Sequence, residues 1–504
     1  MAKHLPAKMT SPREMRPLGE EELYFTLRND LGFYHNVAQT IHLTISDLSD
    51  EGLLHPIYAA LASVVKRHPI LFAVPVCTYA AESSDSVQDH GQSRAYFEQL
   101  PQINLTDVVI LQDGEDSSAA TQSRQETTFD KSHDSFLERI HNTPFEKNKP
   151  LWKVVILRSV GTAGAEKINV NVKLSFVYHH AIGDGLSGLI FLQNLVNSLE
   201  EMLQSGQHDQ FEQIVCPGEK KLLPPLGSLR RSRKVILSPE QDQVKEPAKP
   251  NPGTLWLGHD PINRSPATTC FTSYTFSPQA TKRLLSTVSR QKTSLTPFLQ
   301  TLLAASIFHV VSNTYEYVFN FCSINLRPYV EESLEDVMGS FVAGCRMDYE
   351  RGQFRSNNAS NGDIDSFSAE FWERVQANKT DLLLAVDKSV KGLSTAESSP
   401  NTATDPSKML NWMKNLVDAP RNASFDLNNL GKFSCSETDR IKLGRVIFSA
   451  SQSVIGSALK VNVVTGPNGD MTIGFAWQKE VHDEKTMYNI IDRFRHGIEE
   501  AALE

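Results

Sequence analysis

The segment that most constrains the fold is a run of alternating residues that ends in two histidines and a glycine-rich turn. From residue 168 to residue 178, apolar side chains occupy the even positions and mostly polar ones the odd positions. A period of two is typical of a half-buried β-strand. His179 and His180 follow at once, and Asp184 comes next between Gly183 and Gly185. Strand parity therefore predicts His180 on the apolar face and His179 on the opposite face.

These residue types suggest acid–base chemistry at the end of the strand. A neutral imidazole in a partly dry site can accept a proton near pH 7, so His180 is a candidate general base. The alternative is a structural histidine bonded to the backbone, with Asp184 capping the next helix. Asp184 is predicted either to touch the imidazole or to face away and hold the turn. Gly185 is expected to be needed for the conformation of the backbone rather than for a contact with a ligand. His179 is expected to support the site by packing or hydrogen bonding on the far face.

Other patterns exclude several classes of function. The six cysteines are scattered and form no Cys-x-x-Cys pair, which argues against a zinc site and a disulfide framework. Gly-x-Ser-x-Gly is absent, so an acyl-serine route has no sequence support. The net charge is −9 with acids and bases interspersed, which argues against nucleic acid as a partner.

The length and the distribution of prolines predict two domains. A chain of 504 residues is longer than a domain with one hydrophobic core usually is. Residues 1–210 are expected to form the first domain and residues 269–504 the second, joined by a proline-rich linker at 211–268. The polar stretch 113–134 is expected to be a surface loop. No apolar stretch reaches the length of a membrane span, so no transmembrane segment and a cytoplasmic location are expected. A monomer is expected as well.

The string His-His-x-x-x-Asp-Gly at 179–185 resembles the signature of the chloramphenicol acetyltransferase-like acyltransferase superfamily. That superfamily includes nonribosomal peptide condensation domains and fungal alcohol acetyltransferases. Further blocks resemble the fungal alcohol acetyltransferases, namely residues 16–19, 67–71, 148–152, 324–328, 338–341 and 425–431. Where that family usually has Ser-Asn-Leu-Gly, this chain has Asn428-Asn429-Leu430-Gly431, so no role of that serine is carried over.

The resemblance implies an α/β fold, an α+β sandwich of two chloramphenicol acetyltransferase-like subdomains. Mixed sheets flanked by helices are expected, with an active-site tunnel at the subdomain interface. It also implies acetyl-CoA as the co-substrate, no tightly bound cofactor or metal, and direct attack of the acceptor in a ternary complex. Asp184 is then expected to pair with Arg327 rather than with the imidazole.

The sequence thus favours an acyl-CoA-dependent O-acetyltransferase that acts on a small hydrophobic alcohol or a secondary metabolite. One alternative is N-acylation of a hydrophobic amine, which an acidic residue at the acceptor mouth would favour. Another is a catalytically silent binding protein on the same fold. Acyl transfer needs donors for the developing oxyanion. The candidates are Ser449, Ser451 and Gln452 near a late strand, with Asn428 and Asn429 as competitors and ordinary surface hydrogen bonding as the alternative for each.

Overall fold

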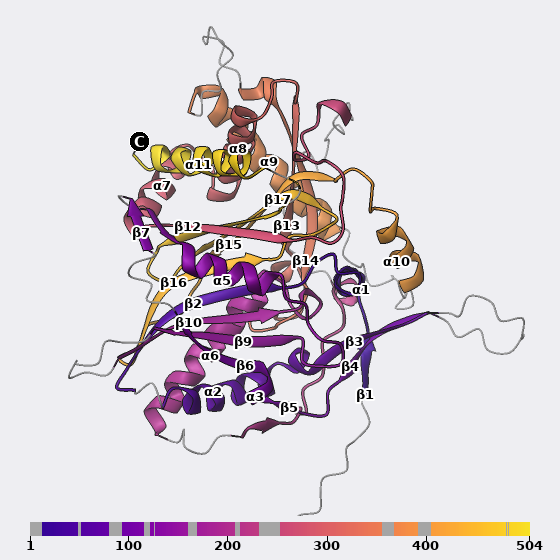
Figure 1. The fold of residues 1–504 in the computed structure, drawn as a ribbon, viewed down its shortest axis with the longest axis vertical. Coiled ribbons are helices and arrows are strands. Elements are labelled where there is room, and N and C mark those ends of the chain that lie inside the picture. Colours follow the sequence, from indigo (N-terminus) through magenta and orange to yellow (C-terminus); the bar gives the residue numbers. More distant parts are fainter. Residues whose placement is uncertain are drawn as a thin grey trace, which may run out of the picture.

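Two mixed β-sheets organise the chain in the computed structural model (Figure 1). The structure describes residues 13–48, 52–79, 93–114, 121–124, 127–159, 169–206, 212–230, 252–354, 367–391, 405–479, 481 and 483–503. The Arg-rich segment 231–234 and parts of the expected linker lie outside these ranges.

The first sheet has five strands in the order β16 (Ile441–Ala450), β2 (Val37–Ser46), β10 (Asn169–Tyr178), β9 (Trp152–Ser159) and β6 (Val109–Gly114). The second has eight strands in the order β14 (Val342–Glu350), β13 (Tyr317–Asn325), β15 (Ala423–Lys432), β17 (Ser457–Thr465), β18 (Met471–Gln478), β12 (Thr269–Phe276), β8 (Thr127–Asp130) and β7 (Thr121–Arg124). Two smaller sheets comprise β1 (Arg13–Pro17), β4 (Arg94–Gln99) and β3 (Ala73–Thr78), and β11 (Ile214–Val215) with β5 (Ile103–Asn104).

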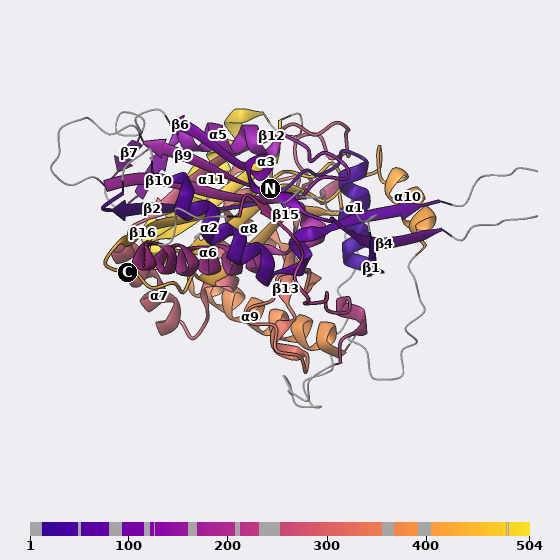
Figure 2. The same ribbon diagram turned by 90° about the horizontal axis from the view of Figure 1, so that it is seen from below.

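Helices cover the outer faces of both sheets. On the side of the first sheet lie α2 (Leu54–Arg67) and α6 (Gly185–Ser205), with the short α3 (Leu105–Val108) beside α2. On the second sheet lie α7 (Pro278–Arg290), α8 (Leu295–Val310), α9 (Ala369–Lys391) and α11 (Glu484–Ala501). The helices α1 (Glu20–Asp30) and α10 (Pro406–Lys414) pack together to one side of both sheets, as the view from below also shows (Figure 2). No described helix has the length and apolar character needed to cross a membrane.

The two halves of the sequence exchange strands. Late in the chain, β16 pairs antiparallel with β2 of the first sheet, from Ile441↔Ile45 to Ala450↔Val37. Early in the chain, β8 pairs with β12 of the second sheet. The stretch 113–134, expected to be a loop, therefore contains β7, β8 and the start of α5 (Lys131–His141). The loop prediction is wrong there because strand pairing across the molecule outweighs local polarity.

A shared core fills the space between the sheets. Buried side chains from α5, from the first sheet and from β12 and β18 meet there, among them Phe136, Val177, Phe271 and Ile447. This core explains where the alternation of β10 ends. Its exposed odd positions, Asn169 and Asn171, give way to a fully buried stretch from Ser175 onward. The strand is half-buried where it begins and buried on both faces where it reaches the histidines.

The described parts of the expected linker pack against both halves. Within the linker, β11 pairs antiparallel with β5 of the first half. Leu229 and Trp256 are buried, and the backbone N–H of Trp256 donates to the carbonyl of Tyr317. Short 3-10 turns complete the chain: η1 (Pro69–Phe72), η2 (His180–Ile182), η4 (Leu226–Ser228), η6 (Pro252–Thr254), η7 (Arg327–Tyr329) and η8 (Arg351–Phe354). The domain boundaries at 210 and 269 stay a prediction.

Candidate active site

The histidine pair lies where β10 passes into α6. The strand ends at Tyr178, His179 keeps an extended backbone, and His180 begins η2. Asp184 then caps α6 by accepting a hydrogen bond from the backbone N–H of Ser187 at 3.0 Å. Both histidines therefore lie beyond the strand, and it is the turn rather than strand parity that separates the two imidazoles.

His180 lines a cavity of about 340 Å³ to which both halves of the sequence contribute. The ring of Phe25, from α1, stacks on its imidazole with centroids 3.6 Å apart and planes 9° apart. Its Nδ1 atom is buried and has no hydrogen-bond partner among the described residues. Burial, assisted by the positive charge of Arg28, lowers the pKa of His180 to about 3. The imidazole is therefore neutral at physiological pH and can accept a proton.

His179 belongs to different surroundings. The residue is 3% exposed, and its Nδ1 accepts a hydrogen bond from the backbone N–H of Ala181 at 2.9 Å. It lines a separate cavity together with Thr26 of α1 and Val74 of β3. Burial, followed by the charge of Arg28, lowers its pKa to about 3 as well. His179 thus stabilises the turn through its hydrogen bond to Ala181, whereas His180 lines the cavity shared by the two halves.

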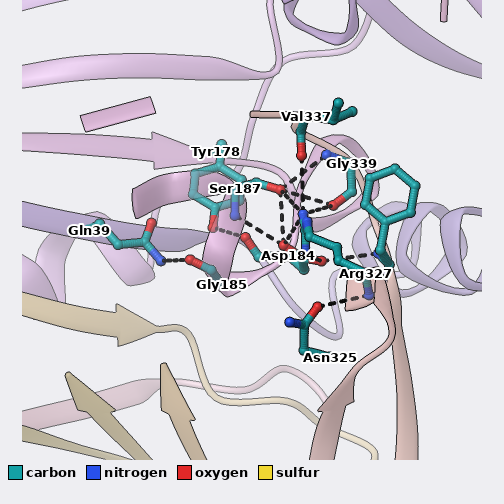
Figure 3. A network of polar contacts seen from close by, with 10 residues as sticks. Gln39, Tyr178, Asp184, Gly185, Ser187, Asn325, Arg327, Val337 and Gly339 are labelled. Carbon is teal, nitrogen blue, oxygen red and sulfur yellow. Dashed lines mark hydrogen bonds and ion pairs between the residues drawn. The ribbon is translucent and has the colours of Figure 1, made fainter. Parts of the chain in front are cut away.

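The Asp184 carboxylate pairs with Arg327 (Figure 3). The guanidinium donates two parallel hydrogen bonds, Nη1 to Oδ2 at 2.7 Å and Nη2 to Oδ1 at 2.9 Å. The backbone N–H groups of Ser187 and Phe341 donate to the same carboxylate. Burial raises the pKa of Asp184, but Arg327 and the backbone donors outweigh it, so the net pKa lies below the ordinary value. The expected ion pair is present and links the α6 turn to η7 in the second half.

Close packing explains the glycines at the start of α6. A Cβ on Gly185 would lie 2.6 Å from Cδ2 of Leu430 and 3.2 Å from Cζ of Phe448, both from the second half. The Gly185 carbonyl accepts a hydrogen bond from Nε2 of Gln39 at 3.0 Å. One turn later, a Cβ on Gly188 would overlap the side-chain amide of the same Gln39. Gly188 was not singled out from the sequence, because its neighbour comes from a strand about 150 positions away.

The five oxyanion candidates separate into two groups. Asn428 and Asn429 line the cavity with His180. Ser449, Ser451 and Gln452 are buried and do not line it. The Ser451 hydroxyl accepts from the backbone N–H groups of residues 35 and 36, the Gln452 amide donates to the carbonyls of residues 457 and 458, and Ser449 lies 3.5 Å from the carbonyl of residue 38. These three side chains bond neighbouring chain segments instead of facing the cavity. They lie on or just after β16, which pairs with β2 in the first sheet.

Several polar residues of the cavity were not predicted as site residues from the sequence, among them Lys460 and Asn462. Lys460 and Asn462 of β17 line it, and they are 9% and 1% exposed. Nζ of Lys460 lies 3.2 Å from Oδ2 of Asp426 on β15. The available signal was a lysine and an asparagine inside the otherwise apolar segment 458–464. Among the described residues, no group of three or more His, Cys, Asp or Glu side chains could hold a metal ion.

Comparisons with known proteins identify the family of this chain. The family model described as "Alcohol acetyltransferase" matches residues 17–497. The probable alcohol acetyltransferase crmB of Aspergillus fumigatus is 28% identical over 482 residues, which cover 93% of this chain and 95% of that protein. The probable alcohol acetyltransferase FCK4 of Fusarium pseudograminearum is 20% identical over 506 residues, 95% of this chain and 94% of that protein.

Solved structures show the same fold at low identity. TRI3 trichothecene 15-O-acetyltransferase from Fusarium sporotrichioides has a TM-score of 0.64 at 12% identity and covers 99% of both chains. The first condensation domain of the CDA synthetase has a TM-score of 0.55 at 13% identity and covers 97% of this chain and 96% of that one. The expected two-subdomain α/β fold with mixed sheets is thus confirmed. Since the family match extends over nearly its whole length, this chain belongs to the alcohol acetyltransferase family and is an acyltransferase.

Proposed function

We propose that the protein transfers an acetyl group from acetyl-CoA to the hydroxyl of an alcohol, with His180 as the general base. The observation that carries the proposal is a neutral imidazole at the wall of a cavity shared by the two halves. Phe25 stacks on its ring, and the turn that carries it is fixed by the Asp184–Arg327 pair.

The reaction needs one proton to travel through the imidazole. His180 takes the proton of the acceptor hydroxyl as its oxygen attacks the thioester carbonyl carbon. The carbon–sulfur bond then breaks, and the imidazolium returns the proton to the departing CoA thiolate. A base with a lowered pKa is a weak one, so the proton moves while the new carbon–oxygen bond forms rather than before it. The same low pKa favours return of the proton to the thiolate.

The charges of the cavity favour a hydroxyl over an amine. Its ionised lining residues among those described are Asp184 and Lys460. Arg327 pairs with Asp184, and Asp426 pairs with Lys460, so the described lining offers no unpaired carboxylate. A protonated amine would find no such carboxylate to bind there and would also need to lose a proton before attack. These charges support the O-acceptor over the N-acceptor alternative.

The direct test is release of free thiol from acetyl-CoA by the purified protein, with alcohols and amines of matched carbon skeleton. Acetylation of alcohols by the wild-type protein, but not by His180→Ala, is the expected result. Acetylation of amines in preference to alcohols would overturn the choice of acceptor. Thiol release without dependence on His180 would overturn the mechanism.

A further inference from the structure

The cavity contains polar side chains that the proposed mechanism does not use. Lys460 and Asn462 are two positions apart on β17, so both side chains lie on the same face of the strand. Both line the same cavity as His180. The parallel register places Asp426 of β15 beside Lys460 and Asn428 beside Asn462. Two neighbouring strands therefore present a polar face to the space where the substrates must meet.

These groups are incompletely satisfied by the protein itself. Nζ of Lys460 approaches Oδ2 of Asp426 and lies 5.3 Å from the centroid of the Tyr34 ring. An ammonium has three N–H donors, so this ion pair leaves donor capacity unused. The side-chain Nδ2 of Asn462 is buried and has no hydrogen-bond partner among the described residues. Asn428 differs, because its Oδ1 accepts from the backbone N–H of Ser323 at 3.1 Å.

Such groups are costly when an apolar ligand covers them. A buried donor or acceptor without a partner loses its hydration and gains nothing in exchange. A hydrocarbon alcohol placed in this cavity would leave the unused donors of Lys460 and the buried Nδ2 of Asn462 without a hydrogen-bond partner. An additional oxygen on the acceptor would accept hydrogen bonds from them.

We propose that Lys460 and Asn462 form a recognition subsite for a carbonyl or carboxylate oxygen of the acceptor, carried on the same molecule as the reacting hydroxyl. The preferred acceptors are then keto alcohols and hydroxy acids rather than hydrocarbon alcohols. This inference rests on the proposed function, because it takes His180 as the base that receives the hydroxyl proton. It narrows the expected small hydrophobic alcohol to an oxygenated one.

The test compares acceptors that share one ring. Cyclohexanol, 3-hydroxycyclohexanone and 3-hydroxycyclohexanecarboxylate are offered with acetyl-CoA, and kcat/KM is measured by thiol release. The wild-type protein should favour the two oxygenated acceptors by about tenfold to a hundredfold, because a site built for a polar group rejects the analogue that lacks it. The variant Asn462→Leu should lose about tenfold on the oxygenated acceptors and little on cyclohexanol.

Removal of the lysine needs a partner change. Lys460→Met alone would leave the Asp426 carboxylate without its cation, so Lys460→Met/Asp426→Asn removes both charges at similar volume. This double variant should lose the preference for the carboxylate acceptor. Lys432→Met, at an exposed position of β15, is the matched control and should keep the wild-type preference.

Each outcome decides between alternatives. Equal losses on all three acceptors would show that the two side chains act on the thioester, and would overturn the acceptor subsite while leaving the transferase intact. A wild-type protein with no preference among the acceptors would overturn it as well, and this result needs no variant to fold. Absence of thiol release with every alcohol would overturn the proposed function, and the subsite with it.

Discussion

At the scale of single residues, His180 owes its behaviour to its immediate surroundings. The stacked ring of Phe25 and the burial of Nδ1 remove water from the imidazole, and Arg28 adds positive charge nearby. All three favour the neutral form. A substitution of His180 should therefore lower the rate of acyl transfer far more than it disturbs the packing around the turn.

We predict that His180→Ala lowers kcat/KM by about 10²–10⁴-fold and leaves the melting temperature nearly unchanged, since general-base catalysis typically contributes that much. His179→Ala should be milder in activity and more harmful to stability, because it removes the acceptor for the Ala181 N–H. Kinetics and thermal melts of both variants test this. Equal activity losses with unchanged melting temperatures would contradict the distinction between the two rings.

At the scale of elements, the α6 turn is held to η7 by one buried ion pair. Breaking such a pair from one side typically costs about 3–5 kcal/mol, because the other charge is left stranded. Replacing both in Asp184→Asn/Arg327→Met should therefore cost less than the sum of the single changes. Chemical unfolding of the four proteins measures the coupling. The exposed pair Arg94–Glu14 is the control and should show a coupling below about 1 kcal/mol. Strictly additive losses at Asp184 and Arg327 would reject the coupling.

The packing of α6 on the first sheet gives a second prediction at this scale. Gly188→Ala forces the buried Gln39 to move, and overpacking of this kind typically costs about 1–3 kcal/mol. The expected result is a lower midpoint of urea unfolding with an unchanged slope. Gly227→Ala is the control, because a Cβ there meets nothing within 4 Å. A Gly188→Ala variant as stable as this control would contradict the packing argument.

Elements also show what the sequence can and cannot predict. The strand before His180 and the capping position of Asp184 follow from local pattern, and the partner Arg327 followed from the family resemblance. The positions of Lys460 and Asn462 depend on the register between β15 and β17, which no local pattern specifies. The strand β16 comes from the second half of the sequence but pairs with β2 in the first sheet, and it carries or precedes Ser449, Ser451 and Gln452. Such pairings between distant segments depend on long-range packing, and that information is spread over the whole sequence.

At the scale of the whole molecule, buried histidines should make stability depend on pH. Burial lowers the pKa of His68 to about 4 and of His141 to about 3. Unfolding restores the ordinary value near 6.5, so the unfolded chain binds more protons and stability is lost as pH falls from about 6.5 towards 4. Burial raises the pKa of Asp134 to about 7, which acts in the opposite direction. Melting temperatures should thus fall from pH 7 to pH 5, and fall more steeply in Asp134→Asn. A flat profile would contradict this balance.

The strand exchange brings both halves of the sequence to one cavity lined by His180. Under the proposed mechanism donor and acceptor meet there, which leads to the last prediction. The cavity lining among the described residues contains no cysteine, and its serine is Ser323. Among the described residues, no hydrogen bond joins the Ser323 hydroxyl to an imidazole that would activate it as a nucleophile, so donor and acceptor should occupy the site together. Initial-rate plots against acetyl-CoA and alcohol should intersect. Labelled acetyl-CoA alone should leave no stoichiometric covalent label, and Ser323→Ala should keep most activity. Parallel lines, together with an acetylated peptide that reacts onward at the turnover rate, would replace direct attack by ping-pong transfer.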